Sequence, residues 1–240
     1  MSPVLSAVRD GVAHLQVFPL ALTLAAYTAA VRLQRLARGS PLANPTLVAI
    51  GTVVLVLSIT GISYRDYFTA NQPINIILGP AVVALGVPLF RHLALIRQRA
   101  APLLLALVVG SSYAIISVVE LGRRVGLSRI ELLSLAPRSA TAGVSMAVSR
   151  QIGGSPPLTA VLTVTGGIAG AVLASYVLNA LRIRDPAARG FGMGLASHGI
   201  ATARAFQECQ TAGTFAGLAM GLNAIVTAVL VPVLVPWLIR

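Results

Sequence analysis

Long apolar runs alternate along the chain with short segments that are basic or interrupted by proline and glycine. Five of the runs are continuous and rich in Val, Leu, Ile and Ala: 17–31, 46–62, 102–121, 158–181 and 212–237. Several approach or exceed the ~20 residues that an α-helix needs to cross a bilayer. None alternates strictly between apolar and polar positions, as a strand of a membrane barrel would. The pattern predicts an all-α polytopic membrane protein.

Three further stretches are apolar but broken. Residues 74–95 contain two interruptions by glycine and proline, residues 133–150 contain a proline, and residues 190–208 are rich in glycine. Such breaks free backbone groups, which then need neighbouring helices or a cavity to satisfy them. We therefore expect about six to eight membrane segments. Two of them, 133–150 and 190–208, are expected to be short and discontinuous or re-entrant.

The boundaries of these runs give local expectations. Residues 1–15 lack the apolar core of a signal peptide and are expected to form a short amphipathic helix at the membrane surface. Asn44 and Pro45 read as the cap and first turn of a helix, whereas 71–73 reads as a turn. We expect one integral domain over 1–240, with N-terminal spans at 17–121 and a core at 133–237.

Charge supports a membrane topology. The chain has 18 basic residues, all of them arginine, against 6 acidic ones, and its net charge is +12. Because the arginines sit in short clusters between apolar runs, we attribute them to cytoplasmic loops and do not expect nucleic-acid binding. Two clusters, 91–99 and 122–131, flank the same span at 102–121. A single span between them cannot leave both clusters in the cytoplasm, so the sequence does not assign loop 122–131 to one side of the membrane.

The sequence gives little support to metal or enzyme chemistry. Cys209 is the only cysteine, so neither an intrachain disulfide nor a cysteine metal site can form. The three histidines, His14, His92 and His198, do not have the spacing of metal ligands. No nucleophile with a base and no phosphate-binding motif is visible. We expect no metal, no cofactor and no enzymatic activity.

The first polar island, APRSAT at 136–141, follows an apolar run. Pro137 can open a helix, which would place Arg138 and Ser139 in its first turn with Thr141 close by. A helix N-terminus favours anions, and a guanidinium can bind a carboxylate with two hydrogen bonds. These residues are candidate ligands for a carboxylate. The alternative is that Arg138 extends to the membrane surface.

The second island, GLASHGIATAR at 194–204, offers Ser197, His198, Thr202 and Arg204. If the segment is helical, His198 and Thr202 share a face. His198 titrates near neutral pH, which suits proton coupling, or it is simply a hydrogen-bonded interior histidine. Arg204 is a second candidate cation, or a structural partner of Glu208 four residues later.

Glycine spacing and a weak internal repeat complete the pattern. Two GxxxG pairs, Gly166 with Gly170 and Gly217 with Gly221, predict close helix packing. LGP at 78–80 precedes LAP at 135–137 by 57 residues, and LAS at 195–197 follows after 60 more. Paired broken segments are a sign of transporter binding sites. They suggest an elevator-like architecture with inverted repeats.

Four ordered motifs resemble a known family over nearly the whole chain: ILGPAVVALGVPL at 77–89, APRSAT at 136–141, GGSPPLTA at 153–160 and ASHGIATAR at 196–204. They are similar to the LrgB/CidB family of bacterial membrane proteins, whose plant relative is the plastid glycolate/glycerate translocator. Arg138 stands where the family usually has lysine, and Ala201 where it usually has glycine. The charge is kept at the first position, and helix flexibility can differ at the second.

The resemblance implies a secondary transporter of small monocarboxylates such as glycolate, glycerate or pyruvate in the bacterial cytoplasmic membrane, for which we consider proton coupling. Its expected partners are the carboxylate substrate, membrane lipid, a second copy in a homodimer, and a small LrgA/CidA-type membrane protein. The alternative that it also implies is an antiholin-like regulator of murein hydrolase export and cell lysis. Such a regulator acts through a membrane assembly and not through transport.

Overall fold

The computed structural model describes residues 17–37, 43–84 and 86–239, and its regular elements there are α-helices. The amphipathic helix expected at 1–15, with His14, lies outside the described residues. The chain separates into two compact units, Met1–Ala84 and Leu85–Arg240. That both act as one integral domain, as the sequence predicts, stays a prediction.

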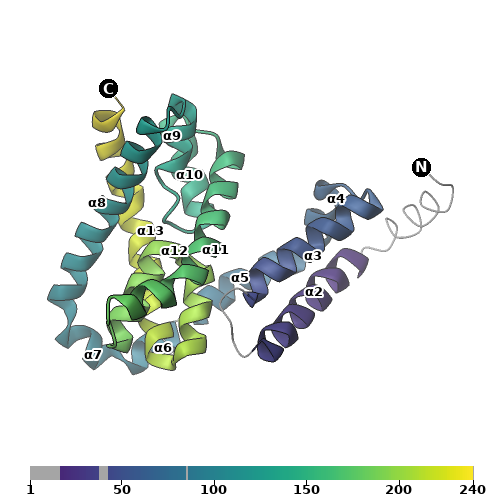
Figure 1. The fold of residues 1–240 in the computed structure, drawn as a ribbon, viewed down its shortest axis with the longest axis horizontal. Helices are drawn as coiled ribbons and strands as arrows, with labels where there is room; N and C mark the ends of the chain where they lie inside the picture. Colours follow the sequence, from purple (N-terminus) through teal and green to yellow (C-terminus); the bar gives the residue numbers. More distant parts are fainter. Residues whose placement is uncertain (1–16, 38–42, 85, 240) are drawn as a thin grey trace. The chain divides into compact units, whose positions relative to one another are not determined.

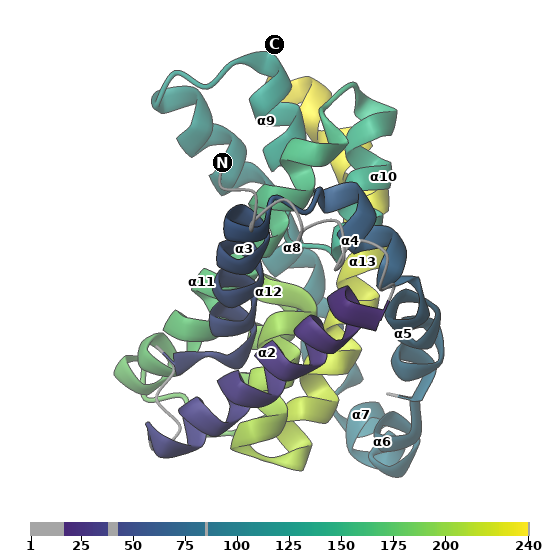
Figure 2. The same cartoon turned by 90° about the vertical axis from the view of Figure 1, so that its right-hand side faces the viewer.

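The described part of the first unit, residues 17–37 and 43–84, contains four helices: α2 (Val17–Leu36), α3 (Pro45–Thr60), α4 (Tyr64–Ala70) and α5 (Gln72–Ala84). Figures 1 and 2 show α2 beside α3, with which it packs. The predicted start of α3 is confirmed, because the Asn44 side chain accepts hydrogen bonds from the backbone of Thr46 and Leu47. The turn expected at 71–73 is wrong in part: α5 already begins at Gln72, and Pro73 in its first turn needs no N–H partner.

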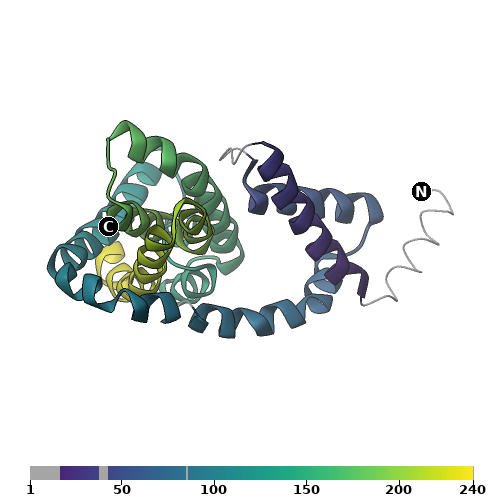
Figure 3. The ribbon, with the colours of Figure 1, turned by 90° about the horizontal axis from the view of Figure 1, so that it is seen from below.

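The second unit contains eight helices in the part that the structure describes. They are α6 (Gly86–Arg91), α7 (Leu93–Gln98), α8 (Ala100–Arg124), α9 (Arg129–Leu135), α10 (Ala142–Ile152), α11 (Pro156–Ala180), α12 (Pro186–Glu208) and α13 (Gln210–Leu238). The helix α13 contacts α6, α8, α10 and α12, and Figure 3 shows it enclosed by its neighbours. Cys209, which is exposed, separates α12 from α13 and caps the latter.

Within the described ranges, four helices are long and apolar enough to cross a membrane: α2, α8, α11 and α13. The helix α3 is also apolar but shorter. The predicted all-helical membrane class is therefore confirmed. The total of six to eight segments, the inverted repeats and the elevator-like architecture stay predictions.

The helix α8 separates the two basic clusters. It is continuous over 25 residues, a length of about 37 Å, so the arginines before and after it lie at opposite ends of a helix long enough to cross a membrane. Arg99 pairs with Asp185 at one end (2.8 Å), whereas Arg123 donates to the backbone carbonyl of Leu238 at the other. The Arg99 guanidinium lowers the pKa of Asp185, which keeps this carboxylate ionised.

The closest helix packing lies at two glycines that were not predicted to provide it. A Cβ atom at Gly190 or Gly194 of α12 would overlap the backbone carbonyl of Ala212 or Ala216 of α13. Only glycine permits this approach of two helix backbones. The predicted contact at Gly221 is not found, because a Cβ atom there would meet nothing within 4 Å.

Candidate functional site

The first island is a buried turn and not the helix start predicted at Pro137. The helix α9 ends at Leu135, and α10 begins only at Ala142, with Thr141 as its N-cap residue. The hydroxyl of Ser145 donates to the carbonyls of Pro137 and Ala140, at 2.7 and 3.1 Å. This side chain satisfies the backbone groups that an α-helix would otherwise have paired, so the turn is stable inside the protein.

The second island is a break in the middle of α12. Ser197 (φ −146°, ψ 25°) and His198 (φ 42°, ψ −137°) have non-helical backbone angles. A positive φ is unfavourable for histidine and costs on the order of 1–3 kcal/mol. Beyond the break the helix resumes, and the Thr202 hydroxyl donates to the His198 carbonyl (2.8 Å). The face predicted to be shared by the two side chains assumed a continuous helix, which the break at His198 interrupts.

Both islands meet on one face of α11, near its middle. A Cβ atom built at Gly166 would lie 3.0 Å from Nη1 of Arg138, and one at Gly167 would lie 2.7 Å from Nε2 of His198. At Gly170 the neighbour is the side chain of Ser197, whose Cβ would be 2.7 Å away. The predicted close packing at the first GxxxG pair is therefore made with island side chains. The three glycines leave the space that the islands occupy.

His198 is also held by a direct hydrogen bond to α11. Its Nε2 lies 3.0 Å from the backbone carbonyl oxygen of Thr163. Because a carbonyl can only accept, Nε2 carries the hydrogen in this arrangement. The other ring nitrogen, Nδ1, is then the one that can take up or release a proton.

Asn223 of α13 connects the two islands, and sequence reasoning missed it. Its side-chain amide donates to the carbonyls of Ser139 (2.9 Å) and Leu195 (3.2 Å), one in each island. Its Oδ1 accepts from the hydroxyls of Ser111 (2.7 Å) and Thr227 (3.2 Å). Asn223 is fully buried. Asn223 could have been found as a lone amide in the apolar run 212–237. Polar groups at such positions are costly unless they have a partner.

Several polar atoms around this meeting point are buried without a hydrogen-bond partner. They are Nε of Arg138, Oγ of Ser139 and Oγ1 of Thr163. Buried polar atoms are normally satisfied, so each exception calls for a ligand, an ordered water or a second conformation. A cation and two hydroxyls of this kind suit a small polar or anionic ligand.

The structure brings five of the seven predicted site residues to these two breaks: Arg138, Ser139, Ser197, His198 and Thr202. Thr141 lies at the N-cap of α10, where its side chain makes no capping hydrogen bond. Arg204 lies six residues beyond His198 and donates to Oε1 of Gln207 (3.1 Å).

Glu208, the structural partner considered for Arg204, forms an ion pair with Arg189, and the charge of Arg204 also acts on its carboxylate. Its carboxylate accepts from Nε and Nη2 of Arg189, at 3.0 and 3.1 Å, and from the Ser175 hydroxyl at 2.7 Å. Arg189 also donates to Asn179. Sequence spacing alone could not identify this partner, because Arg189 reaches it from the opposite end of α12.

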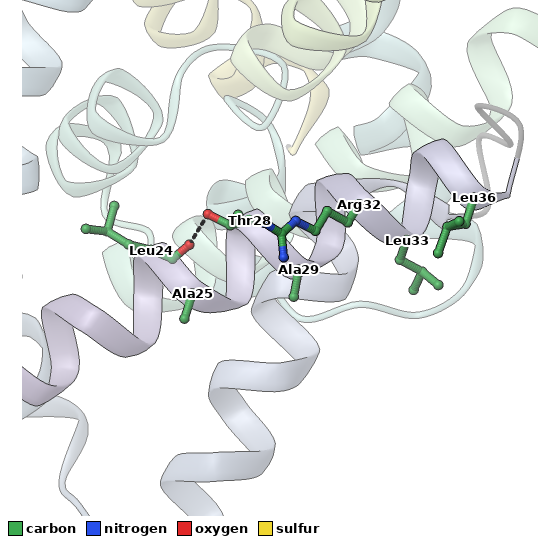
Figure 4. Close-up of a pocket in the computed structure, with 7 residues that line it drawn as sticks. All are labelled: Leu24, Ala25, Thr28, Ala29, Arg32, Leu33 and Leu36. Atoms are coloured by element: carbon green, nitrogen blue, oxygen red, sulfur yellow. Dashed lines mark hydrogen bonds between the residues drawn. The ribbon is translucent and has the colours of Figure 1, made fainter.

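Pockets also lie in the first unit, where Thr23 forms hydrogen bonds with Tyr67 and Asn71. A groove on α2 is lined by seven residues of that helix alone, and Figure 4 shows Arg32 among them with Thr28 bonded to the Leu24 carbonyl (2.7 Å). Among the residues that the structure describes, no group of three or more His, Cys, Asp or Glu side chains could hold a metal ion.

Comparison with known proteins gives a consistent result. The sequence model of the LrgB-like family matches residues 23–237. The holin-like protein CidB of Staphylococcus aureus is 33% identical over 205 residues, which cover 85% of this chain and 89% of the relative. CidB of Staphylococcus epidermidis is 31% identical over 210 residues, covering 88% and 91%. The protein YxaC of Bacillus subtilis is 33% identical, with the same coverage as the first.

The names of these relatives favour one of the two functions considered above. "Holin-like" agrees with the alternative, a membrane protein concerned with lysis, and names neither a carboxylate nor an enzymatic reaction. No solved structure matches the chain.

Proposed function

This chain belongs to the LrgB-like family, and from that premise we propose that it is a holin-like membrane protein that regulates murein hydrolase export and cell lysis. The holin-like names of its relatives carry this proposal. The apolar helices and these relatives also confirm the predicted location, a multi-pass protein of the bacterial cytoplasmic membrane. We propose further that it works in an assembly with a small CidA-type membrane protein.

An assembly of this kind needs helix faces that can receive a partner. The second GxxxG pair of α13 suits that role at Gly221, which is exposed and has open space where its side chain would be. Small residues let the backbone of another helix approach closely within a bilayer. Contacts through this face, in a homodimer or with the small partner, would set the activity.

The regulator proposal predicts different effects for two substitutions. The full chain would be expressed together with the small membrane protein in a bacterium deleted for its own LrgB-like proteins. Released murein hydrolase activity and the rate of autolysis would be measured. We expect Gly221→Leu to abolish the change that the unmodified chain causes, because its side chain fills the contact face, and Arg138→Ala to leave that change intact. Loss with Arg138→Ala and persistence with Gly221→Leu would contradict the proposal.

A second function, transport of a small monocarboxylate, is favoured by the two buried breaks. Arg138 and His198 approach the middle of α11, and paired broken segments at mid-membrane are where secondary transporters bind substrates. Arg138 would bind the carboxylate, and the hydroxyls of Ser139, Thr141, Ser197 and Thr202 its other oxygens. His198 would orient the substrate or carry a proton, and Arg204 would be a second cation. We propose an elevator-like movement for this case.

Uptake of labelled glycolate, glycerate and pyruvate into proteoliposomes tests the carrier. With a pH gradient across the membrane, we expect saturable uptake that falls roughly 10–100-fold in Arg138→Ala, the loss typical of a hydrogen bond to a charged group. Arg150→Ala is the matched control, because Arg150 is exposed in the last turn of α10 and should leave uptake unchanged. Equal uptake by the unmodified chain and both variants would show that Arg138 is not part of the binding site. Absence of uptake in all three would contradict the carrier proposal and leave the regulator proposal.

A further inference from the structure

The larger unit has a cavity lined by the helices α8 and α12. It has a volume of about 360 Å³ and lies between the first turns of α8 and the N-terminal half of α12. Its walls are apolar: Pro102, Leu103 and Ala106 come from α8, and Ala187, Phe191 and Leu195 come from α12. The only charged residue that lines it is Arg99, at the N-cap of α8.

Arg99 is placed where a lipid headgroup would lie. It immediately precedes α8, a membrane-spanning helix, so it lies at the boundary of the apolar layer. Its Nη1 donates to Asp185, but its side chain is 42% exposed and a guanidinium has five N–H groups. Donors therefore remain for a second anion beside this carboxylate.

The surrounding loops are basic. Arg97 lies in the last turn of α7, and Arg182 and Arg184 precede Asp185 in the loop before α12. Arg189 is already neutralised by Glu208. An excess of positive charge at the mouth of an apolar cavity between membrane helices is complementary to an anionic lipid, whose phosphate and acyl chain need these two environments.

We propose that this cavity binds one anionic phospholipid, with the phosphate on Arg99 and an acyl chain between α8 and α12. A free phosphate would leave the apolar walls unoccupied. A zwitterionic lipid would bring a second cation to a mouth that is already basic.

The position of the cavity links the lipid to the α12 break. Leu195 forms part of its wall, and the carbonyl of the same residue accepts the hydrogen bond from Asn223. Leu195 precedes Ser197, where the helix is broken, by two residues. The side chain of Leu195 also packs on Gly110 of α8. A bound acyl chain would therefore contact the residue whose carbonyl Asn223 holds, two residues before the break in α12.

Native mass spectrometry of the purified full chain tests this binding with phosphatidylglycerol and phosphatidylcholine of the same acyl chains. We expect phosphatidylglycerol to bind at least about fivefold more tightly, the effect of one or more arginines near an anionic headgroup. Arg99→Gln should remove this preference. Asp185→Asn breaks the same ion pair but keeps the guanidinium, so it should retain the preference.

A second pair of variants tests the acyl chain. Gly192 lines the cavity, and a Cβ atom there meets nothing within 4 Å, so Gly192→Leu should fill the cavity without disturbing the fold and lower binding about tenfold or more. Gly51→Leu, at an exposed and equally open position of α3, should bind as the unmodified chain does. Melting temperatures would identify any variant that is not folded.

Three results would overturn the proposal. One is equal affinity for the two lipids, and another is equal loss in Arg99→Gln and Asp185→Asn, which would assign only a structural role to the ion pair. The third is unchanged binding in Gly192→Leu.

Discussion

Replacing Asn223 by leucine is expected to destabilise the protein by about 2–5 kcal/mol. The substitution leaves the carbonyls of Ser139 and Leu195 without their donor, and it removes the acceptor of the Ser111 hydroxyl. Ser111, Ser139 and Asn223 are buried, so water does not readily replace the lost partner of these groups. Thermal unfolding in detergent, followed by scanning fluorimetry, would measure the change.

Two further variants test whether Asn223 stabilises the islands specifically, or whether any loss of a polar side chain has the same effect. Asn223→Asp keeps the acceptor for Ser111 and Thr227 but removes both N–H donors to the islands, so we expect it to be at least as harmful as the leucine. Thr165→Val removes a hydroxyl that bonds only to carbonyls of its own helix, and it should change stability little. A melting temperature for Asn223→Leu equal to that of Thr165→Val would show that Asn223 does not hold the two breaks together.

The second large effect is expected from a single methyl group on α12. Gly194→Ala places a Cβ atom on the backbone carbonyl of Ala216, so the two helices must separate. Overpacking of this kind costs roughly 1–3 kcal/mol, and more where the obstacle is backbone. The matched variant is Gly192→Ala, on the same helix and with open space around it. It should stabilise the chain by up to about 1 kcal/mol, because alanine favours a helix over glycine.

The comparison of these two alanine variants is informative because their chemistry is identical. Melting temperature and the fraction of monodisperse protein in size-exclusion chromatography would be recorded for both. If Gly194→Ala melted at or above the temperature of Gly192→Ala, the close contact between α12 and α13 would be absent from the protein in detergent.

The sequence predicted the membrane-spanning helices well, because hydropathy acts over many residues. The run at 102–121 became α8 at Ala100–Arg124, and the run at 158–181 became α11 at Pro156–Ala180. The breaks in the two polar islands were also predicted, although their form was not. Pro137 was expected to open a helix, but the Ser145 hydroxyl instead stabilises a turn eight residues earlier. Such a contact is tertiary and has no signature in local spacing.

The candidate site was predicted by residue type, and its arrangement was not. Arg138 and His198 were recognised as costly groups in an apolar sequence, which is a property of each residue alone. That they approach neighbouring glycines of α11 depends on how three helices pack. Asn223 escaped notice because it stands alone in a long apolar run, and three of its four hydrogen-bond partners lie 28 to 112 residues away in the sequence.

The glycines at 166, 167 and 170 also restrict how this sequence can change over evolutionary time. Each provides the room taken by a side chain of an island, so a larger residue on α11 requires a smaller one opposite it. A mutation to alanine at Gly167 would be harmful first and tolerated only after His198 had been replaced. Because neighbouring substitutions of this kind are not additive, the two positions are expected to co-vary among relatives. The order in which such paired mutations accumulate is therefore constrained by the packing of one helix face.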